Sequence, residues 1–130
     1  FWVTLRTSMG RNGGSNSQGY MFSELINTFR VNDYVAINIS PKYFFSGGNS
    51  FAGLGVSGYI KIKEHLQLIA ETNASFNNDT DLNSSLALRY SYDPMRSIDF
   101  YYSNSSGIHD IGTLLQNDEY RFGIKLNFLY

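Results

Sequence analysis

Apolar and polar residues alternate along most of the chain. In the last segment one face carries Tyr120, Phe122, Ile124, Leu126, Phe128 and Tyr130, and the other carries Arg121, Gly123, Lys125 and Asn127. Successive side chains of a β-strand point to opposite faces of the sheet, so a period of two predicts a strand. The C-terminal segment is therefore expected to be a strand with one apolar and one polar face.

The same alternation recurs in six further segments. They cover residues 2–6, 35–45, 52–62, 66–74, 82–92 and 98–103. Residues 20–31 differ, because Met21, Phe22, Leu25, Ile26 and Phe29 fall at the spacing of an amphipathic helix. We interpret this segment as a strand too, since it makes the strand number even and Asn32-Asp33 is typical of a hairpin turn. Eight antiparallel strands follow, with a helix at 20–31 as the alternative.

The connections between these segments differ in length. Short ones lie around Asn32-Asp33, Lys63-Glu64-His65 and Asp93-Pro94-Met95, and longer ones cover residues 10–19, 46–50, 77–81 and 104–119. Long and short connections alternate, as in outer-membrane barrels with short periplasmic turns and longer external loops. An all-β, antiparallel up-and-down barrel of about eight strands is expected, either complete or as part of a larger barrel.

All charged residues of the predicted strands lie opposite the apolar stripe. They are Arg6, Glu24, Arg30, Lys42, Lys61, Glu71, Arg89, Asp99, Arg121 and Lys125. A Lys or Arg that faces lipid at mid-depth costs about 2–4 kcal/mol, so lipid outside and a polar lumen inside would select this segregation. A soluble sandwich or lipocalin-like barrel, with its apolar face inward, is the alternative.

Aromatic residues favour the membrane barrel over the soluble one. Tyr and Phe crowd the ends of the predicted strands, as in the interfacial girdles of membrane barrels. These residues are Tyr20, Tyr43, Phe44, Phe45, Phe51, Tyr90, Tyr92, Tyr101, Tyr102, Tyr120, Phe128 and Tyr130. The C-terminal strand, through Gly123, Leu126, Phe128 and Tyr130, resembles the signal by which bacterial barrels are recognised for assembly. The resemblance implies the barrel-assembly machinery as a partner.

Several segments also match a known group of proteins. They are Gly19-Tyr20-Met21, Asn38-Ile39-Ser40-Pro41-Lys42-Tyr43-Phe44, Leu66-Gln67-Leu68-Ile69-Ala70-Glu71, Ile111-Gly112-Thr113-Leu114-Leu115 and the closing strand. Through them the chain resembles the C-terminal portion of outer-membrane barrel proteins of the cyanobacterial kind. The resemblance implies a barrel fold and a place in the bacterial outer membrane, in contact with its lipid. None of the segments is a catalytic motif, so no site residue is carried over.

Composition narrows the classes of function. The 130 residues are expected to form one barrel domain or barrel segment, residues 1–130, and the start at Phe1 indicates that processing or truncation removed the true N-terminus. A net charge of −1 without a basic run argues against nucleic-acid binding. The chain has no cysteine, which excludes disulfides and thiolate metal sites.

The long connection at 104–119 holds the only candidate catalytic group. Ser105, Ser106, His109 and Asp110 are the residue types of a hydrolase at the barrel rim. Their spacing does not enforce a triad, so we expect no enzyme and name no catalytic residue. Ile108, Ile111, Leu114 and Leu115 lie at helical spacing and would cover the barrel mouth or pack against the rim.

No metal or other cofactor is expected. The acidic pairs Asp79 with Asp81 and Asp118 with Glu119 fall short of the six or more oxygens that a hard cation takes.

The predicted lumen charges point to two functions. Seven are basic and three are acidic, so a wide lumen would favour anions. Porin-like passage of small polar or anionic solutes is the first interpretation, supported by Gly53, Gly55 and Gly123, which leave room in the lumen. A structural or interaction barrel, with a lumen filled by side chains and displayed loops, is the second. Homo-oligomerisation stays open.

Overall fold

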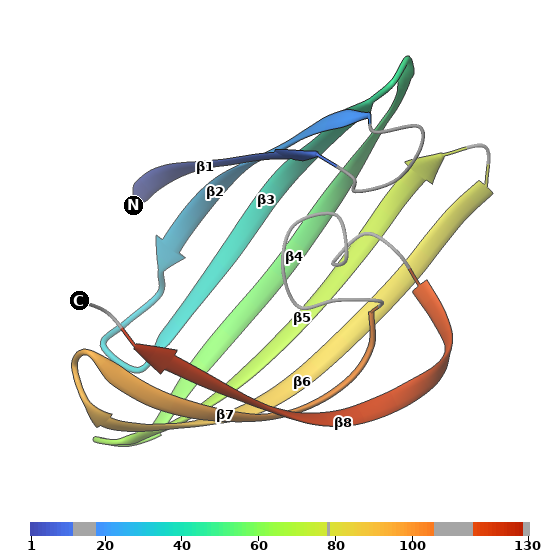
Figure 1. Cartoon of the computed structure of the whole chain (residues 1–130). Coiled ribbons are helices and arrows are strands. Elements are labelled where there is room, and N and C mark those ends of the chain that lie inside the picture. Colours follow the sequence, from blue (N-terminus) through green and yellow to red (C-terminus); the bar gives the residue numbers. More distant parts are fainter. Residues whose placement is uncertain (12–17, 78, 106–115, 129–130) are drawn as a thin grey trace.

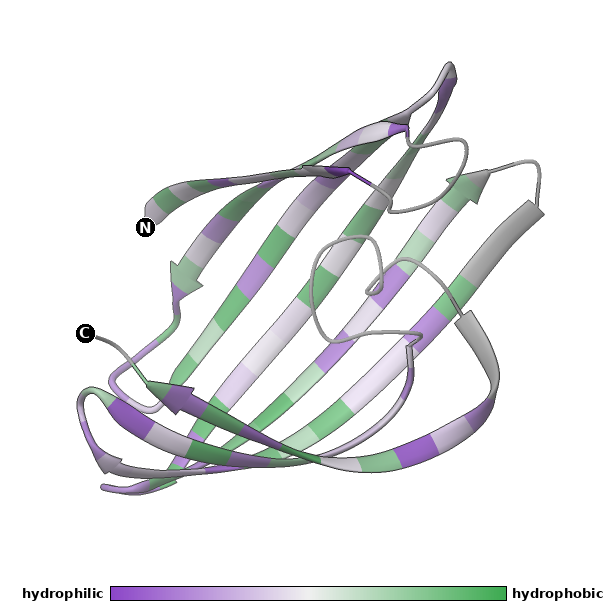
Figure 2. Ribbon diagram, in the orientation of Figure 1, coloured by the Kyte–Doolittle hydropathy of each residue, from purple (hydrophilic) through white to green (hydrophobic). Residues whose placement is uncertain are grey.

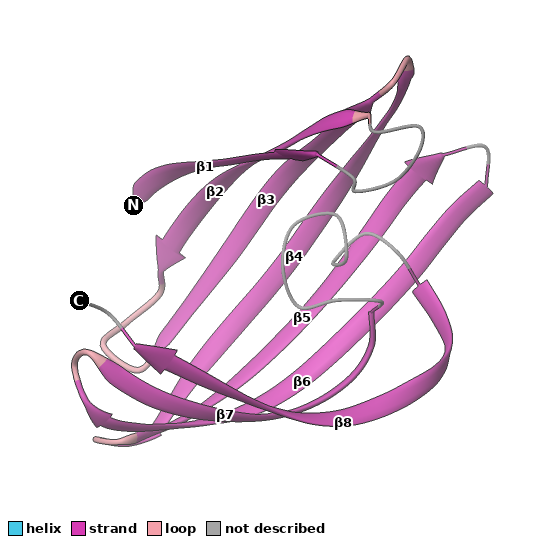
Figure 3. Ribbon diagram, in the orientation of Figure 1, coloured by secondary structure: helices cyan, strands magenta, loops and turns pink. Residues whose placement is uncertain are grey.

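The computed structural model of the protein describes residues 1–11, 18–77, 79–105 and 116–128. Within these ranges the chain forms eight strands and no helix (Figure 1; Figure 3). The strands are β1 (Trp2–Arg11), β2 (Gly19–Arg30), β3 (Val35–Ser46), β4 (Asn49–Lys63), β5 (Leu66–Asn77), β6 (Asp79–Asp93), β7 (Arg96–Ser105) and β8 (Gln116–Phe128). The described part of the chain accordingly has no helix long and apolar enough to span a membrane.

The strands form one curled sheet in the order β1 to β8, and each pairs antiparallel with its neighbours in sequence. This confirms the predicted all-β, up-and-down arrangement of eight strands. Closure of these eight strands into a complete barrel, one of the two expected arrangements, is not found: β1 and β8 are the two open edges of the described sheet, which is a half-barrel (Figure 1). Alternation along a strand fixes which side chains share a face, but it does not specify the partner of the first and last strands.

Residues 20–31, which could have formed a helix, lie largely in β2. The helix-like spacing has a simple origin. A separation of four is even, so Met21, Leu25 and Phe29 share one face of the strand, and Phe22 and Ile26 share the other. The registers agree, since Leu25 pairs with Leu5 and Phe29 with Ile37 on the same face. The strand interpretation is confirmed, and its apolar residues divide between both faces.

Two connections that were expected to be long are tight turns. β3 ends at Ser46 and β4 begins at Asn49, so only Gly47 and Gly48 lie between them. Their φ values of 54° and 90° are both positive, as a type I′ hairpin turn requires at its two central residues. Likewise, one residue separates β5 from β6. The prediction that long and short connections alternate is therefore wrong, because Ser46, Asn49 and Ser50 continue β3 and β4, and Asn77 and residues 79–81 continue β5 and β6.

Hydrophilic and hydrophobic residues alternate along the strands (Figure 2), and because alternate residues point to opposite faces, the two faces of the sheet differ in character. Among the described residues, Phe22 and Ala36 are the buried apolar ones. Ten buried residues are polar or charged, namely Glu24, Thr28, Ser40, Lys42, Asn73, Ser75, Asn83, Asp99, Ser103 and Asn104. Large apolar side chains instead remain exposed on the convex face, including Leu5, Leu25, Ile37, Leu54, Val56, Leu86, Phe100, Phe122, Ile124 and Leu126. The usual polarity of a globular domain is inverted.

The aromatic residues do not all lie on the convex face, as an outward-facing girdle would require. Tyr20 and Phe44 have ring centroids 6.2 Å apart, and Phe44 and Phe51 have centroids 5.0 Å apart, on the concave face. Tyr101 also belongs to the concave face. Convex and exposed aromatics are Tyr43, Phe45, Tyr90, Tyr92, Tyr102, Tyr120 and Phe128, and Tyr130 lies outside the described residues. The girdle prediction is wrong for the four concave rings.

The turn between β3 and β4 gives a stability prediction. At Gly48, φ is +90° and a Cβ would have no atom within 4 Å, so backbone strain alone decides the effect of a substitution. We expect Gly48→Val to lower the free energy of unfolding by about 1–2 kcal/mol, since L-residues with branched side chains disfavour positive φ. Gly48→Asn is the matched control and should cost less, because Asn tolerates this region. Urea titration followed by fluorescence of Trp2 measures both, and equal costs would contradict the turn geometry.

Candidate functional site

The strand registers place all ten predicted strand charges on the concave face. Arg6 pairs with Glu24, and Glu24 pairs with Lys42, across β1, β2 and β3. A second set of residues paired in register on successive strands contains Lys61, Gln67, Arg89, Asp99 and Lys125, on β4 to β8. The polar residues that lie between the charges in these strands share the same face, because alternate residues of a strand do.

Lys42 is the centre of the first charge network. Its ammonium lies 3.3 Å from Oε1 of Glu71, 3.8 Å from Oε2 of Glu24 and 2.5 Å from Oδ1 of Asn73. On the other side of Glu24, the guanidinium Nε of Arg6 lies 2.9 Å from Oε1. The side chain of Lys42 is only 3% exposed, so the carboxylates offset the cost of removing its charge from water.

Glycine on β4 allows Lys42 to reach β5. A Cβ at Gly55 would lie 2.6 Å from Oδ1 of Asn73 and 2.9 Å from Cε of Lys42. The missing side chain is thus replaced by the Lys42–Asn73 contact, which passes over β4. At Gly123 the ring of Tyr101 occupies the equivalent space. Gly55 and Gly123 were expected to leave the lumen open, and this expectation is wrong, because side chains of neighbouring strands fill both positions.

A second network fixes β6, β7 and β8 to one another. Arg89 donates from Nε and Nη2 to the two carboxylate oxygens of Asp99, at 2.7 and 2.8 Å. The side-chain amide of Asn127 donates to the same carboxylate at 3.1 Å. A bidentate pair of this kind fixes direction as well as distance. Asp99 is therefore held from both neighbouring strands.

Neutral polar side chains extend the Lys42 network from β5 to β6 and β7. The amide of Asn73 donates to Glu71 at 2.8 Å and to Asn83 at 3.2 Å, and the hydroxyl of Ser105 donates to Asn83 at 3.0 Å. Asn73 and Asn83 are each 1% exposed. Sequence reasoning, which followed charges, missed these residues. Their place in the polar half of the alternation was the available signal.

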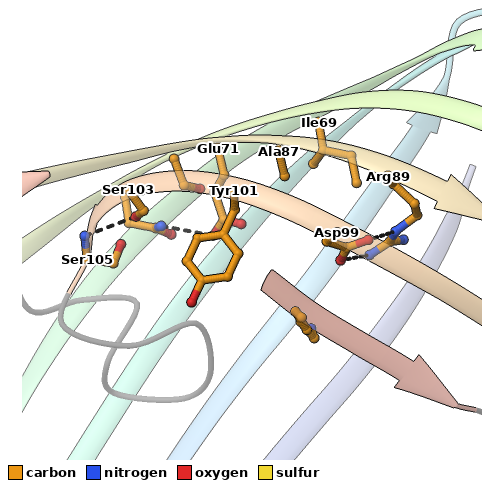
Figure 4. Close-up of a pocket in the computed structure, with 11 residues that line it drawn as sticks. Ile69, Glu71, Ala87, Arg89, Asp99, Tyr101, Ser103 and Ser105 are labelled. Atoms are coloured by element: carbon orange, nitrogen blue, oxygen red, sulfur yellow. Dashed lines mark hydrogen bonds and ion pairs between the residues drawn. The ribbon is translucent and has the colours of Figure 1, made fainter. Parts of the chain in front are cut away.

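Between the two networks lies a cavity of about 140 Å³ (Figure 4). Residues from β5 to β8 line it, namely Ile69, Glu71, Asn73, Ser85, Ala87, Arg89, Asp99, Tyr101, Ser103, Ser105 and Lys125. The close-up shows Arg89 and Asp99 at one end of this set, and Ser103 and Ser105 at the other. Nine of the eleven lining residues are polar or charged, so the cavity is suited to water, ions or small polar solutes.

The remaining predicted charges lie away from the networks. Arg30 is exposed and lies 3.7 Å from Asp33 of the following turn. Lys61 lines a wider depression near the turns, together with His65, Asp93 and Arg96. Arg121 is exposed on the concave face of β8.

Part of the sequence hypothesis falls outside the described residues. The rim group is represented only by Ser105, since Ser106, His109 and Asp110 lie beyond the described ranges, as do the apolar residues Ile108, Ile111, Leu114 and Leu115. The same holds for Tyr130 and for the side chains of Asp79, Asp81 and Asp118. In the part that the structure describes, no three or more His, Cys, Asp or Glu side chains are grouped as a metal site would require.

Comparison with protein-family models, with curated proteins and with solved structures finds no match to the chain. The physical features of the sheet are therefore the basis for inferring its function.

The Lys42 network predicts a large loss of stability when the ammonium group of Lys42 is removed. Lys42→Met keeps the volume but leaves Glu24 without its second cation and Glu71 without its nearest one. We expect a loss of about 3–5 kcal/mol, the usual effect of breaking a buried ion pair. Lys63→Met, in the exposed end of β4, is the control and should change the free energy of unfolding by less than about 0.5 kcal/mol. Equal effects in urea titrations would contradict the central role of Lys42.

Proposed function

We propose that the chain is a β-barrel segment of the bacterial outer membrane whose concave face lines a passage for small polar solutes, with a preference for anions. The observation that carries this proposal is the inverted polarity of the sheet. Apolar side chains are exposed on the convex face, and charged side chains are buried and paired on the concave face. Such a distribution is unfavourable in water and favourable when lipid surrounds the sheet.

Strand length supports a membrane location. A transmembrane β-strand needs about 9–11 residues to cross the hydrocarbon core at its usual tilt. The shortest strands, β1 and β7, have 10 residues, and β4 and β6 have 15. Every described strand is thus long enough to cross.

The open curvature of the sheet and the charges on its concave face support the passage of solutes. Eight strands form a half-barrel here rather than a closed one, and a barrel with more strands has a wider lumen. Of the ten charged residues that the sequence predicted for the lumen, seven are basic and three are acidic, a surplus of basic groups within this set. A lumen with this surplus concentrates anions over cations.

A structural barrel with a filled lumen is the second candidate. It is supported by the contacts that fill the space at Gly55 and Gly123, and by the buried ion pairs around Lys42. In this alternative the networks hold the strands together and no solute passes. Measurement of conductance separates the two candidates.

The last strand supports a proposed route of assembly. In β8, Leu126 and Phe128 are exposed, and Gly123 is covered by Tyr101. The alternating, aromatic pattern of β8 resembles the signal by which bacterial barrels are recognised for assembly, and we include that machinery among the proposed partners.

Lipid contact on the convex face predicts a position-specific cost of charge. Val56 lies at the middle of β4 and is 45% exposed. We expect Val56→Lys to make folding into phosphatidylcholine vesicles less favourable by about 2–4 kcal/mol, because the ammonium would lie near the bilayer midplane. Urea titrations in vesicles measure this change.

The control is Val31→Lys, in the turn after β2, where Val31 is 61% exposed. It should change the free energy of folding by less than about 0.5 kcal/mol. If Val56→Lys costs no more than Val31→Lys, the convex face does not contact lipid and the membrane proposal fails.

Passage predicts ion currents. Purified protein in a planar bilayer should give discrete steps, and a salt gradient should give a reversal potential with the sign of anion preference. Arg121→Glu replaces a concave basic group by an acidic one and should reduce that preference, whereas Arg121→Lys should retain it. Bilayers that stay silent at high protein load would rule out passage and leave the structural barrel.

A further inference from the structure

One cation in the cavity between β5 and β8 has no partner among the protein's described residues. Lys125 pairs in register with Asp99, but both oxygens of that carboxylate are taken by Arg89, and Asn127 donates to one of them. Within the described ranges, the ammonium of Lys125 forms neither a hydrogen bond nor an ion pair. A half-buried ammonium without a partner favours an anion from solution.

The charges around the cavity leave one positive charge over. Of the four charged lining residues, Asp99 is neutralised by Arg89 at 2.7 Å, and Glu71 by Lys42 at 3.3 Å from outside the lining. Lys125 is the remaining charge. Arg6 and Arg89 add positive potential at its ammonium, and Glu71 and Asp99 add negative potential. The balance favours an anion of single charge, because the two carboxylates repel a second negative charge.

Hydroxyl donors line the same cavity. Tyr101 and Ser85 both belong to the lining, and neither side chain has a hydrogen-bond partner within the described part of the chain. Hydroxyls donate to oxyanions, and an ammonium adds a charge-assisted bond. Two hydroxyls and one ammonium are a suitable donor set for a carboxylate.

We propose that this cavity binds a small monocarboxylate, with Lys125 as its ion-pair partner and Tyr101 and Ser85 as hydrogen-bond donors. The volume of about 140 Å³ is close to that of a cavity that accommodates benzene, about 150 Å³. Carboxylates of two to four carbons fit within this limit. The inference rests on the proposed function in one respect: if solutes pass along the concave face, the cavity is an anion-binding site within the permeation pathway.

Propionate is the probe, and saturation-transfer NMR on the folded full chain in detergent micelles is the measurement. Wild-type protein should give a saturable signal. Lys125→Met should weaken binding at least tenfold, roughly the effect of losing one charge-assisted hydrogen bond. Lys125→Arg should keep binding within about threefold, because it restores the charge. Tyr101→Phe, which keeps the ring over Gly123, should weaken binding several-fold.

Lys61→Met is the matched control, since it removes a concave cation that lines a different depression and should leave propionate binding unchanged. Far-UV circular dichroism confirms that each variant is folded. If Lys125→Met does not fold, Lys125→Arg and Tyr101→Phe decide the outcome. Phosphate, tested in parallel, should bind more weakly than propionate at pH 7.5.

Three results would overturn the proposal. They are the absence of saturable binding to folded wild-type protein, equal binding by wild type and Lys125→Met, and tighter binding of phosphate than of propionate. The outcome is independent of passage. Binding without conductance retains the site and removes the channel, and anion conductance without binding retains the channel and removes the site.

Discussion

The burial of the Lys42 ammonium is the constraint on which the concave face depends. A charge that is almost fully removed from water is stable only when its partners lie in fixed places. Glu24 on β2 and the Glu71 and Asn73 pair on β5 are those partners, so the network sets the spacing of four strands at once. Gly55 on the strand between is required by the same geometry, because any side chain there would occupy the path of Lys42.

The second network works differently and leaves space. Arg89 and Asp99 satisfy each other in a flat, bidentate contact along β6 and β7, so they do not extend across the sheet as Lys42 does. The cavity lies where this difference arises. Lys42 reaches over Gly55 and fills the concave face there. Arg89 stays beside Asp99 on the neighbouring strand and leaves the space of the cavity open.

Sequence alone predicted the strands, their antiparallel order and the face on which each charge lies, because the period of two is a local property. It did not predict the turn at Gly47-Gly48, where polar residues looked like a loop, nor the inward direction of Tyr20, Phe44, Phe51 and Tyr101. Contacts between non-adjacent strands, such as Lys42 with Glu71, depend on the curvature of the sheet. No pattern within one strand contains that information. Asn73 and Asn83 pair directly across β5 and β6, and they were missed because only charged residues were followed.

The open edges of β1 and β8 have a thermodynamic consequence in a lipid environment. An unpaired backbone amide or carbonyl costs several kcal/mol in hydrocarbon, and each free edge presents a row of such groups. Direct pairing of β1 with β8 would satisfy them but would bring Arg6 close to Lys125 and Arg121. In a bilayer, strands with acidic residues on their lumen side would join these edges at the lowest electrostatic cost.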